Sequence, residues 1–210
     1  MSKLERNWQY AEQYPGETEA QVRARRLSLE LGIEPVSRSV AAHLSGLTVL
    51  SRARAICGVG TRVGVSGLSL LRPSDEATLT SIEIEPEHLR EARTVFAEAG
   101  IPASRLRLIE GDALHVLPRL NLGSYDLVLL DANPAQLLEH FEHALGIVRP
   151  GGSVVVPGAF SHGRVPDPAA RDEATQAMRD LLALVAESPA IASVLSPAGD
   201  GVLTLVRLND

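Results

Sequence analysis

A glycine-rich turn is the first feature of the sequence that could do chemistry. Gly58, Gly60 and Gly64 lie in the segment 58–64, between a short apolar segment and a predicted helix. Glycine lets the backbone come close to a ligand, but the dinucleotide-binding pattern G-x-G-x-x-G fails here, because its third glycine would fall on Val63. Taken alone, the turn is equally consistent with a tight strand-to-helix connection that binds nothing.

Acidic residues follow the ends of successive predicted strands. Glu83 ends the second strand, about 20 residues after the turn, where a carboxylate can accept hydrogen bonds from both ribose hydroxyls of an adenosine. Asp112, in the segment 110–113 after the third strand, could meet an adenine amino group, and Asp131 follows the fourth strand. Each acid by itself is more often a helix cap or a solvated loop residue. Their recurrence at strand ends favours a binding site for an adenosine-containing molecule.

Strand-like and helix-like segments alternate through the middle of the chain. Predicted strands cover residues 54–59, 78–84, 106–109, 125–130 and 153–156. Predicted helices lie between them, over residues 65–71, 87–99 and 134–148. This alternation predicts a parallel sheet with right-handed crossovers, which binds its ligands at the carboxyl ends of the strands.

Helices precede this alternating unit and a hairpin ends it. Thr18 and Gln21 form a capping-box pattern at the start of a helix. A long helix over about residues 169–187 leads to two strands, 191–195 and 202–208, which a Gly-rich turn joins as a hairpin. The predicted fold class is α/β: a single Rossmann-like, doubly wound, mostly parallel seven-stranded sheet with a C-terminal antiparallel hairpin and N-terminal helices.

Composition narrows the range of partners. Of the 210 residues, 45% are hydrophobic and 22% charged, so we expect one domain over residues 18–210 and an N-terminal arm over residues 1–17. The net charge of -6, without a basic and aromatic cluster, argues against nucleic acid. No apolar run approaches the roughly 20 residues of a membrane span. Cys57 is the only cysteine and no secretion signal is recognisable, so we expect a cytoplasmic protein.

The order of these motifs resembles that of the class I S-adenosylmethionine-dependent methyltransferases. More narrowly, it is similar to the bacterial O-methyltransferases related to catechol O-methyltransferase, over about residues 18–208. The segments that carry the resemblance are the glycine-rich turn and residues 82–88, 110–113, 125–131 and 149–152. The resemblance implies S-adenosylmethionine as the cofactor, a small hydroxylated molecule as the methyl acceptor, and a homodimer.

The resemblance also implies a cofactor site. Gly60 and Gly64 would approach the cofactor, and Ser66 would bind its methionine carboxylate at a helix N-terminus. Glu83 would hold the ribose.

The remaining residues of this implied site follow the third and fourth strands. Asp112 and Ala113 would edge the adenine. Asp131 would lie beside the methionine portion and the catalytic centre.

The sequence departs from this family at the residues that handle the metal and the proton. The family holds a divalent metal with the acid matching Asp131 and with an Asp-Asn pair, which aligns here with Pro157 and Gly158. Neither offers a side-chain oxygen, so we expect no metal site and no divalent metal cofactor. The family's lysine near this acid is missing too, because Lys3 is the only lysine.

Two residues remain as candidates for removing the acceptor's proton. They are Asp131 and His162, which lies in the loop 160–164 after the fifth predicted strand. The pair His140 and His143 has helical spacing, but the glutamates beside it favour a solvated helix face over a metal site.

A further departure concerns the glycine-rich turn. The family places an acid at the position of Gly58 and a small residue at that of Arg62. Arg62 therefore either pairs with an anionic group of the ligand, such as a carboxylate or phosphate, or fills the space that the methionine portion of the cofactor would need.

Two other function classes stay open beside the enzyme. A catalytically silent relative could bind S-adenosylmethionine, S-adenosylhomocysteine or another nucleoside. The departures that favour it are those at Gly58, Arg62, Pro134, Pro157 and Gly158. A nicotinamide-dependent oxidoreductase is disfavoured by the broken glycine pattern, the terminal hairpin and the lack of residues for a substrate domain.

Overall fold

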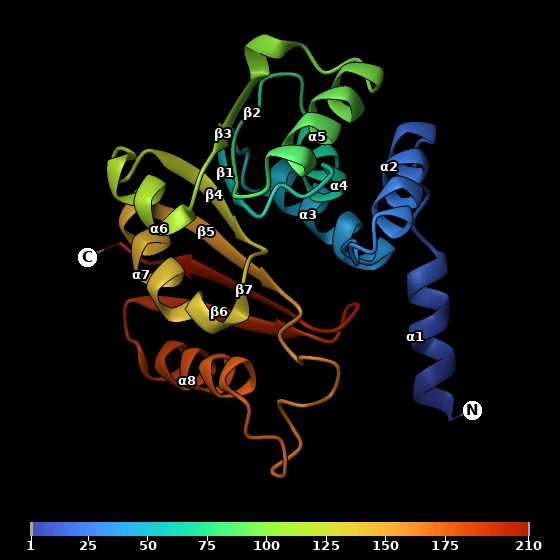
Figure 1. Ribbon diagram of the computed structural model, residues 1–210. Coiled ribbons are helices and arrows are strands. Elements are labelled where there is room, and N and C mark those ends of the chain that lie inside the picture. The colour runs from blue at the N-terminus through green and yellow to red at the C-terminus, as the bar shows by residue number, and fades with distance from the viewer. Residues whose placement is uncertain (1, 210) are drawn as a thin grey trace.

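A seven-stranded sheet forms the centre of the computed structural model, which describes residues 2–209 (Figure 1). The strands are β1 (Ala55–Val59), β2 (Thr78–Glu83), β3 (Leu106–Glu110), β4 (Tyr125–Leu130), β5 (Val148–Pro157), β6 (Ile191–Ser196) and β7 (Val202–Arg207). Their order across the sheet is β3-β2-β1-β4-β5-β7-β6. Every pairing from β3 to β5 is parallel, and β7 runs antiparallel to both β5 and β6. The predicted fold class is confirmed.

Helices cover both faces of this sheet. One layer holds α2 (Glu19–Glu30), α3 (Arg38–Leu50), α4 (Val65–Leu71) and α5 (Pro86–Glu98). The other layer holds α6 (Ala113–Val116), α7 (Leu137–Ile147) and α8 (Glu173–Glu187). Short 3-10 helices cover Ala103–Arg105, Leu117–Arg119 and Pro134–Gln136. Within residues 2–209, no helix is long and apolar enough to cross a membrane.

The side chains of the central strands supply two cores, one on each face. In β4, Leu127 and Leu129 pack with the layer of α2 to α5, whereas Val128 and Leu130 pack with the layer of α6 to α8. Successive side chains of a strand point to opposite faces, so a strand covered on both sides must be apolar throughout. Burial of each such side chain contributes roughly 1.5–3 kcal/mol, which anchors the carboxyl ends of β1 and β4.

Two predicted element starts differ from the structure by four residues or more. The segment 150–152 was expected to stop a helix, but β5 begins at Val148 and runs through it, with a register irregularity against β4. Gly151 adopts φ +74°, so a glycine kink keeps the chain in the sheet where proline and glycine normally end an element. The last helix begins at Glu173, because the Asp172 side chain accepts a hydrogen bond from the Thr175 N–H and so caps it there.

The N-terminal helix α1 (Lys3–Gln13) projects beside α2 and α3 and has no buried residue (Figure 1). Its Glu12 carboxylate nevertheless reaches two other parts of the chain. It accepts hydrogen bonds from the hydroxyls of Ser37 and Ser39 at the start of α3, and from the Gly199 N–H in the turn between β6 and β7. Burial alone would raise the pKa of Glu12, but these hydrogen bonds lower it below its ordinary value.

The strand order reverses direction between β1 and β4, which is the expected place for a ligand crevice. The Asp131 N–H donates to the carbonyl of Val59, so the chain segments leaving β4 and β1 touch. A Cβ on Gly60 would lie 2.0 Å from the Asp131 carbonyl oxygen, and Gly60 has φ +82°. Glycine is therefore required here to let the two loops meet.

Candidate functional site

Two cavities open at the carboxyl ends of the parallel strands. The smaller, about 420 Å³, lies over β1, β2 and the start of α6, and the larger, about 510 Å³, lies between the α2–α3 connection and the loop after β5. Residues that line both are Ile33, Arg62, Asp131, Ala132 and Pro134. The two cavities thus share one wall, built from the turn after β1 and the loop after β4.

Glu83 lies at the end of β2 with its carboxylate on the smaller cavity, and only 6% of the residue is exposed. Its Oε2 accepts from the Arg62 N–H at 2.6 Å, and its Oε1 accepts from the Glu85 N–H at 3.0 Å. His88 Nδ1 is 3.8 Å from Oε1. The side chain therefore fixes the glycine-rich turn while it faces the place predicted for a ribose.

Asp112 and Ala113, at the start of α6, also line the smaller cavity. The Asp112 side chain accepts from the Leu114 N–H at 2.9 Å and so caps α6. Gly60 also lines this cavity. The structure therefore brings Gly60, Glu83, Asp112 and Ala113 together around one cavity.

Gly64 and Ser66 lie away from that cavity. Gly64, with φ +90°, packs under the ring of Phe96, where an added Cβ would come within 3.3 Å of the ring. Ser66 borders a separate space of about 10 Å³ behind the turn, which Arg62 and Asp131 also border. A role for these two residues in holding the cofactor's methionine carboxylate stays a prediction.

Asp131 sits on the wall between the cavities, with 13% of its side chain exposed. Its Oδ1 is 2.9 Å from the Arg62 Nη2. Burial raises the pKa of the Asp131 carboxyl from 3.8 to about 6. The positive charge of Arg62 opposes this rise, whereas the negative charges of Glu83 and Glu34 add to it. A carboxyl that titrates near neutral pH can take up and release a proton under working conditions.

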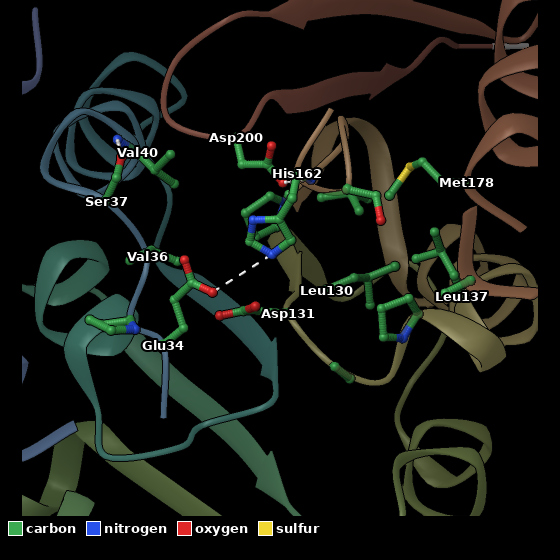
Figure 2. Close-up of a pocket in the computed structure, with 18 of the residues that line it drawn as sticks. Glu34, Val36, Ser37, Val40, Leu130, Asp131, Leu137, His162, Met178 and Asp200 are labelled. Atoms are coloured by element: carbon green, nitrogen blue, oxygen red, sulfur yellow. Dashed lines mark hydrogen bonds and ion pairs between the residues drawn. The ribbon is translucent and has the colours of Figure 1, made fainter. Parts of the chain in front are cut away.

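His162 lines the larger cavity from the loop after β5 and is far more exposed, with 70% of its side chain accessible. Its backbone has φ +54°, and its N–H donates to the Asp200 carboxylate at 2.7 Å. Figure 2 shows the carboxylates of Glu34 and Asp131 directed toward its imidazole, and Glu34 Oε2 is 3.7 Å from Nε2. The structure thus places both candidate bases, Asp131 and His162, on the larger cavity.

The described residues of the larger cavity do not form the set of oxygen ligands that a divalent metal needs. Pro157 and Gly158 do line the larger cavity beside Asp131, but their side chains carry no oxygen. One oxygen of Asp131 is already bound by Arg62. Among residues 2–209, no group of three or more His, Cys, Asp or Glu side chains is arranged to hold a metal. Because Mg²⁺ prefers several oxygen ligands, these residues do not fit a resident divalent ion.

Two residues that line the cavities were not predicted from the sequence. The Glu34 carbonyl accepts a hydrogen bond from Arg62 Nη1, and Glu34 also lines the larger cavity. No local sequence pattern indicated this residue. His140 was expected on a solvated face, but it is 3% exposed and lines the smaller cavity, where burial lowers its pKa. The spacing of Leu137, His140 and Ala144 places them on one buried helix face, a signal outweighed by the neighbouring glutamates.

The sheet order and the cavities at its carboxyl edge are those of a Rossmann-like fold, which the chain shares with solved methyltransferases. In structure, the chain is similar to the O-methyltransferase TomG of Streptomyces achromogenes, solved with S-adenosylmethionine, at TM-score 0.86 and 29% identity over all of both chains. An O-methyltransferase of Bacillus cereus solved with S-adenosylhomocysteine shares the fold at TM-score 0.84 and 22% identity, over 96% of this chain and 99% of the other.

Sequence comparison gives the family. Residues 14–208 match the O-methyltransferase family model. A Mycobacterium tuberculosis protein named "Probable O-methyltransferase" is 44% identical over 98% of this chain and 92% of its own. A Mycobacterium avium protein, whose name also assigns it provisionally to the O-methyltransferases, is 48% identical over 88% of this chain and 83% of its own. The chain belongs to the O-methyltransferase family and is a methyltransferase.

Proposed function

We propose that the chain is an S-adenosylmethionine-dependent O-methyltransferase that methylates a small hydroxylated molecule without a divalent metal. The observation that carries this proposal is the pair of cavities that meet at Asp131. In-line transfer between two bound molecules requires two adjoining sites with the reacting groups brought to one wall. The cofactor belongs in the smaller cavity and the acceptor in the larger.

The smaller cavity has the chemistry that an adenosine needs. The Glu83 carboxylate can accept from the ribose hydroxyls, and Asp112 and Ala113 can edge the adenine. S-adenosylmethionine, when bound there, supplies a methyl group on a positively charged sulfur. The anionic side chains of Glu83, Asp112 and Asp131 all line this cavity, so its charge suits that cation.

The larger cavity supplies the base. Asp131 is held by Arg62 against the shared wall, so its carboxylate can accept the proton of an acceptor hydroxyl that approaches from this side. His162 is the second candidate, and the loop that carries it closes one side of the same cavity. Apolar residues, including Leu130, Leu137 and Met178, line the remainder and favour an acceptor with an apolar body (Figure 2).

Calorimetric titration with S-adenosylmethionine, S-adenosylhomocysteine and NAD in parallel tests the cofactor assignment. We expect the two adenosyl compounds to bind and NAD not to bind. A methyl-transfer assay over a panel of hydroxylated aromatics then tests the reaction. Binding of NAD alone would contradict the proposal.

A catalytically silent binding protein is the second candidate. The observation that favours it is the engagement of both key carboxylates, since Glu83 is hydrogen-bonded to two backbone N–H groups and Asp131 is paired with Arg62. Measurable binding of S-adenosylhomocysteine, with no turnover on any acceptor of the panel, would establish this alternative.

A further inference from the structure

Arg62 is the positive charge on the wall between the two cavities. Among the described residues that line them, it is the one arginine or lysine. About a third of its side chain, 33%, remains exposed, so the guanidinium is reachable from the cavity space. Its charge therefore lies where a hydroxyl oxygen of the acceptor would meet the methyl donor.

Hydrogen bonds to three residues hold Arg62 in this place. Its backbone N–H binds Glu83, its Nη1 donates to the Glu34 carbonyl at 2.5 Å, and its Nη2 donates to Asp131 Oδ1 at 2.9 Å. Its backbone adopts φ +47°, a left-handed conformation that costs a non-glycine residue roughly 1–2 kcal/mol. A guanidinium has more N–H donors than these contacts use, so donors remain for a ligand.

We propose that Arg62 is a catalytic residue, whose guanidinium donates a hydrogen bond to the reacting oxygen of the acceptor and so selects acceptors with a single acidic hydroxyl group, of which monophenols are the simplest. This inference rests on the proposed function. Arginine is always charged and cannot take up a proton, so Arg62 stabilises the negative charge on the oxygen while Asp131 receives the proton.

In the proposed methyl transfer, Asp131 receives the proton and the sulfur receives the electron pair of the broken bond. The hydroxyl proton of the acceptor passes to the Asp131 carboxylate. The acceptor oxygen uses a lone pair to form the new O–C bond to the methyl carbon of S-adenosylmethionine, and the breaking C–S bond leaves its electron pair on sulfur. The products are the methyl ether, S-adenosylhomocysteine and protonated Asp131, which returns its proton to water.

The substrate class follows from how a guanidinium binds oxygen. A divalent ion bound to few protein ligands depends on a chelating acceptor with two adjacent hydroxyls. Arg62 is tethered to Asp131 and Glu34 by the protein itself, so one acceptor oxygen is enough. A phenolic hydroxyl is favoured over an alcohol because hydrogen bonds from a cation stabilise its ionised form, and this help matters most for the less acidic phenols.

The test compares variants of Arg62 on para-substituted monophenols of graded acidity, with catechol as the chelating comparison. Arg62→Met removes the charge and donors, Arg62→Lys keeps the charge without the planar fork, and Arg62→Gly suits the left-handed backbone and leaves space. Arg90→Met is the matched control, because Arg90 pairs with Glu87 on the exposed surface of α5. Calorimetry with S-adenosylmethionine and S-adenosylhomocysteine accompanies each assay.

For Arg62→Met we expect kcat/KM on weakly acidic phenols to fall about 10²–10³-fold, as on removal of a donor to a developing oxyanion. The loss should shrink for 4-nitrophenol, which is readily ionised without help, and S-adenosylhomocysteine affinity should stay within about threefold. Free guanidinium chloride should restore part of the activity of Arg62→Gly. Arg62→Lys should have a lower kcat/KM than the wild type, and Arg90→Met should have the same kcat/KM as the wild type.

The results that would contradict the role of Arg62 differ from the result that would contradict the proposed function. An equal loss on every phenol, matched by an equal loss of cofactor affinity, would make Arg62 a cofactor ligand and overturn the inference. Unchanged activity of Arg62→Met, or a wild-type enzyme that methylates catechol but no monophenol, would also overturn it. A wild-type chain that binds neither adenosyl compound would instead contradict the proposed function.

Discussion

The guanidinium of Arg62 and the carboxylate of Asp131 form an ion pair at 2.9 Å on the wall shared by the two cavities. The two residues lie 69 positions apart in the chain and come from loops that follow adjacent parallel strands. Their contact makes one unit of a cation and a proton acceptor. Its protonation state should therefore control the reaction.

Activity should rise with pH as Asp131 ionises. Its pKa is raised to about 6, so below that pH most molecules carry a protonated Asp131, which cannot accept the acceptor's proton. We expect kcat/KM, measured with a pre-ionised and a neutral phenol, to increase through about pH 6 for the neutral phenol. Asp131→Asn should lose this pH limb and about 10²–10⁴-fold in rate. Retention of the limb in Asp131→Asn would assign it to another group.

The same substitution should stabilise the fold at alkaline pH. The pKa of Asp131 is higher in the folded chain than the ordinary 3.8, so its contribution to stability is full below that value and is lost as pH rises through about 6. At pH 8, Asp131→Asn should raise the free energy of unfolding by up to about 3 kcal/mol, since one pKa unit corresponds to about 1.4 kcal/mol. Urea unfolding at pH 8 and at pH 4 tests this, and an equal effect at both would contradict it.

Replacement of Glu83 should weaken both cofactor binding and folding. Glu83→Ala removes a charged acceptor from the smaller cavity, so affinity for S-adenosylhomocysteine should fall by about 1.5–3 kcal/mol. From sequence alone, stability would be expected to hold, but the variant also strands the N–H groups of Arg62 and Glu85, at about 1–3 kcal/mol. Calorimetry and thermal unfolding measure the two effects. Glu110→Ala, at the exposed end of β3, is the control.

Gly60→Ala should be strongly destabilising. The new Cβ would lie 2.0 Å from the Asp131 carbonyl oxygen and would add the strain of φ +82°, a combined cost of about 2–5 kcal/mol. Gly100→Ala is the matched control, because Gly100 has φ +74° but open space around it, so only the backbone cost of about 1–2 kcal/mol should apply. Similar unfolding free energies for the two variants would contradict the close approach of the two loops.

Methyl transfer should be insensitive to metal removal. Pro157 and Gly158 provide no side-chain oxygen, and Arg62 binds Asp131 where a cation would bind. We expect equal initial rates with EDTA, without EDTA and with added Mg²⁺. Activity abolished by EDTA and restored by Mg²⁺ would show that ligands were overlooked.

Sequence reasoning predicted the elements that depend on local pattern. The strand 125–130 and the helix 65–71 have the predicted bounds. An uninterrupted apolar run marks the first and a glycine-rich turn marks the start of the second, and both signals come from neighbouring residues in the sequence. The start of β5 at Val148 was missed, since a kinked strand through proline and glycine has no local signature distinct from a turn.

For the candidate site, position at a strand end predicted three acidic residues, Glu83, Asp112 and Asp131, that line the smaller cavity; their roles in binding and catalysis stay predictions. The pairing of Arg62 with Asp131 could not be foreseen, because it depends on a left-handed backbone and on contact between distant loops. The sequence therefore indicates which residues line the cavities better than it indicates how their side chains pair.

Glu12 gives α1 an influence that its lack of buried residues conceals. Its carboxylate ties the start of α3 to the β6–β7 turn, and both flank the larger cavity through Ser37 and Asp200. Helix α1 thus braces two walls of the larger cavity from outside, and neither Ser37 nor Asp200 is among the residues that line the smaller cavity. Hydrogen bonding lowers the pKa of Glu12, so these contacts are complete at pH values above the ordinary titration range of a glutamate. They are lost as the pH falls and Glu12 becomes protonated. Removal of the Glu12 carboxylate would therefore loosen two walls of the larger cavity without removing a residue that lines the smaller one.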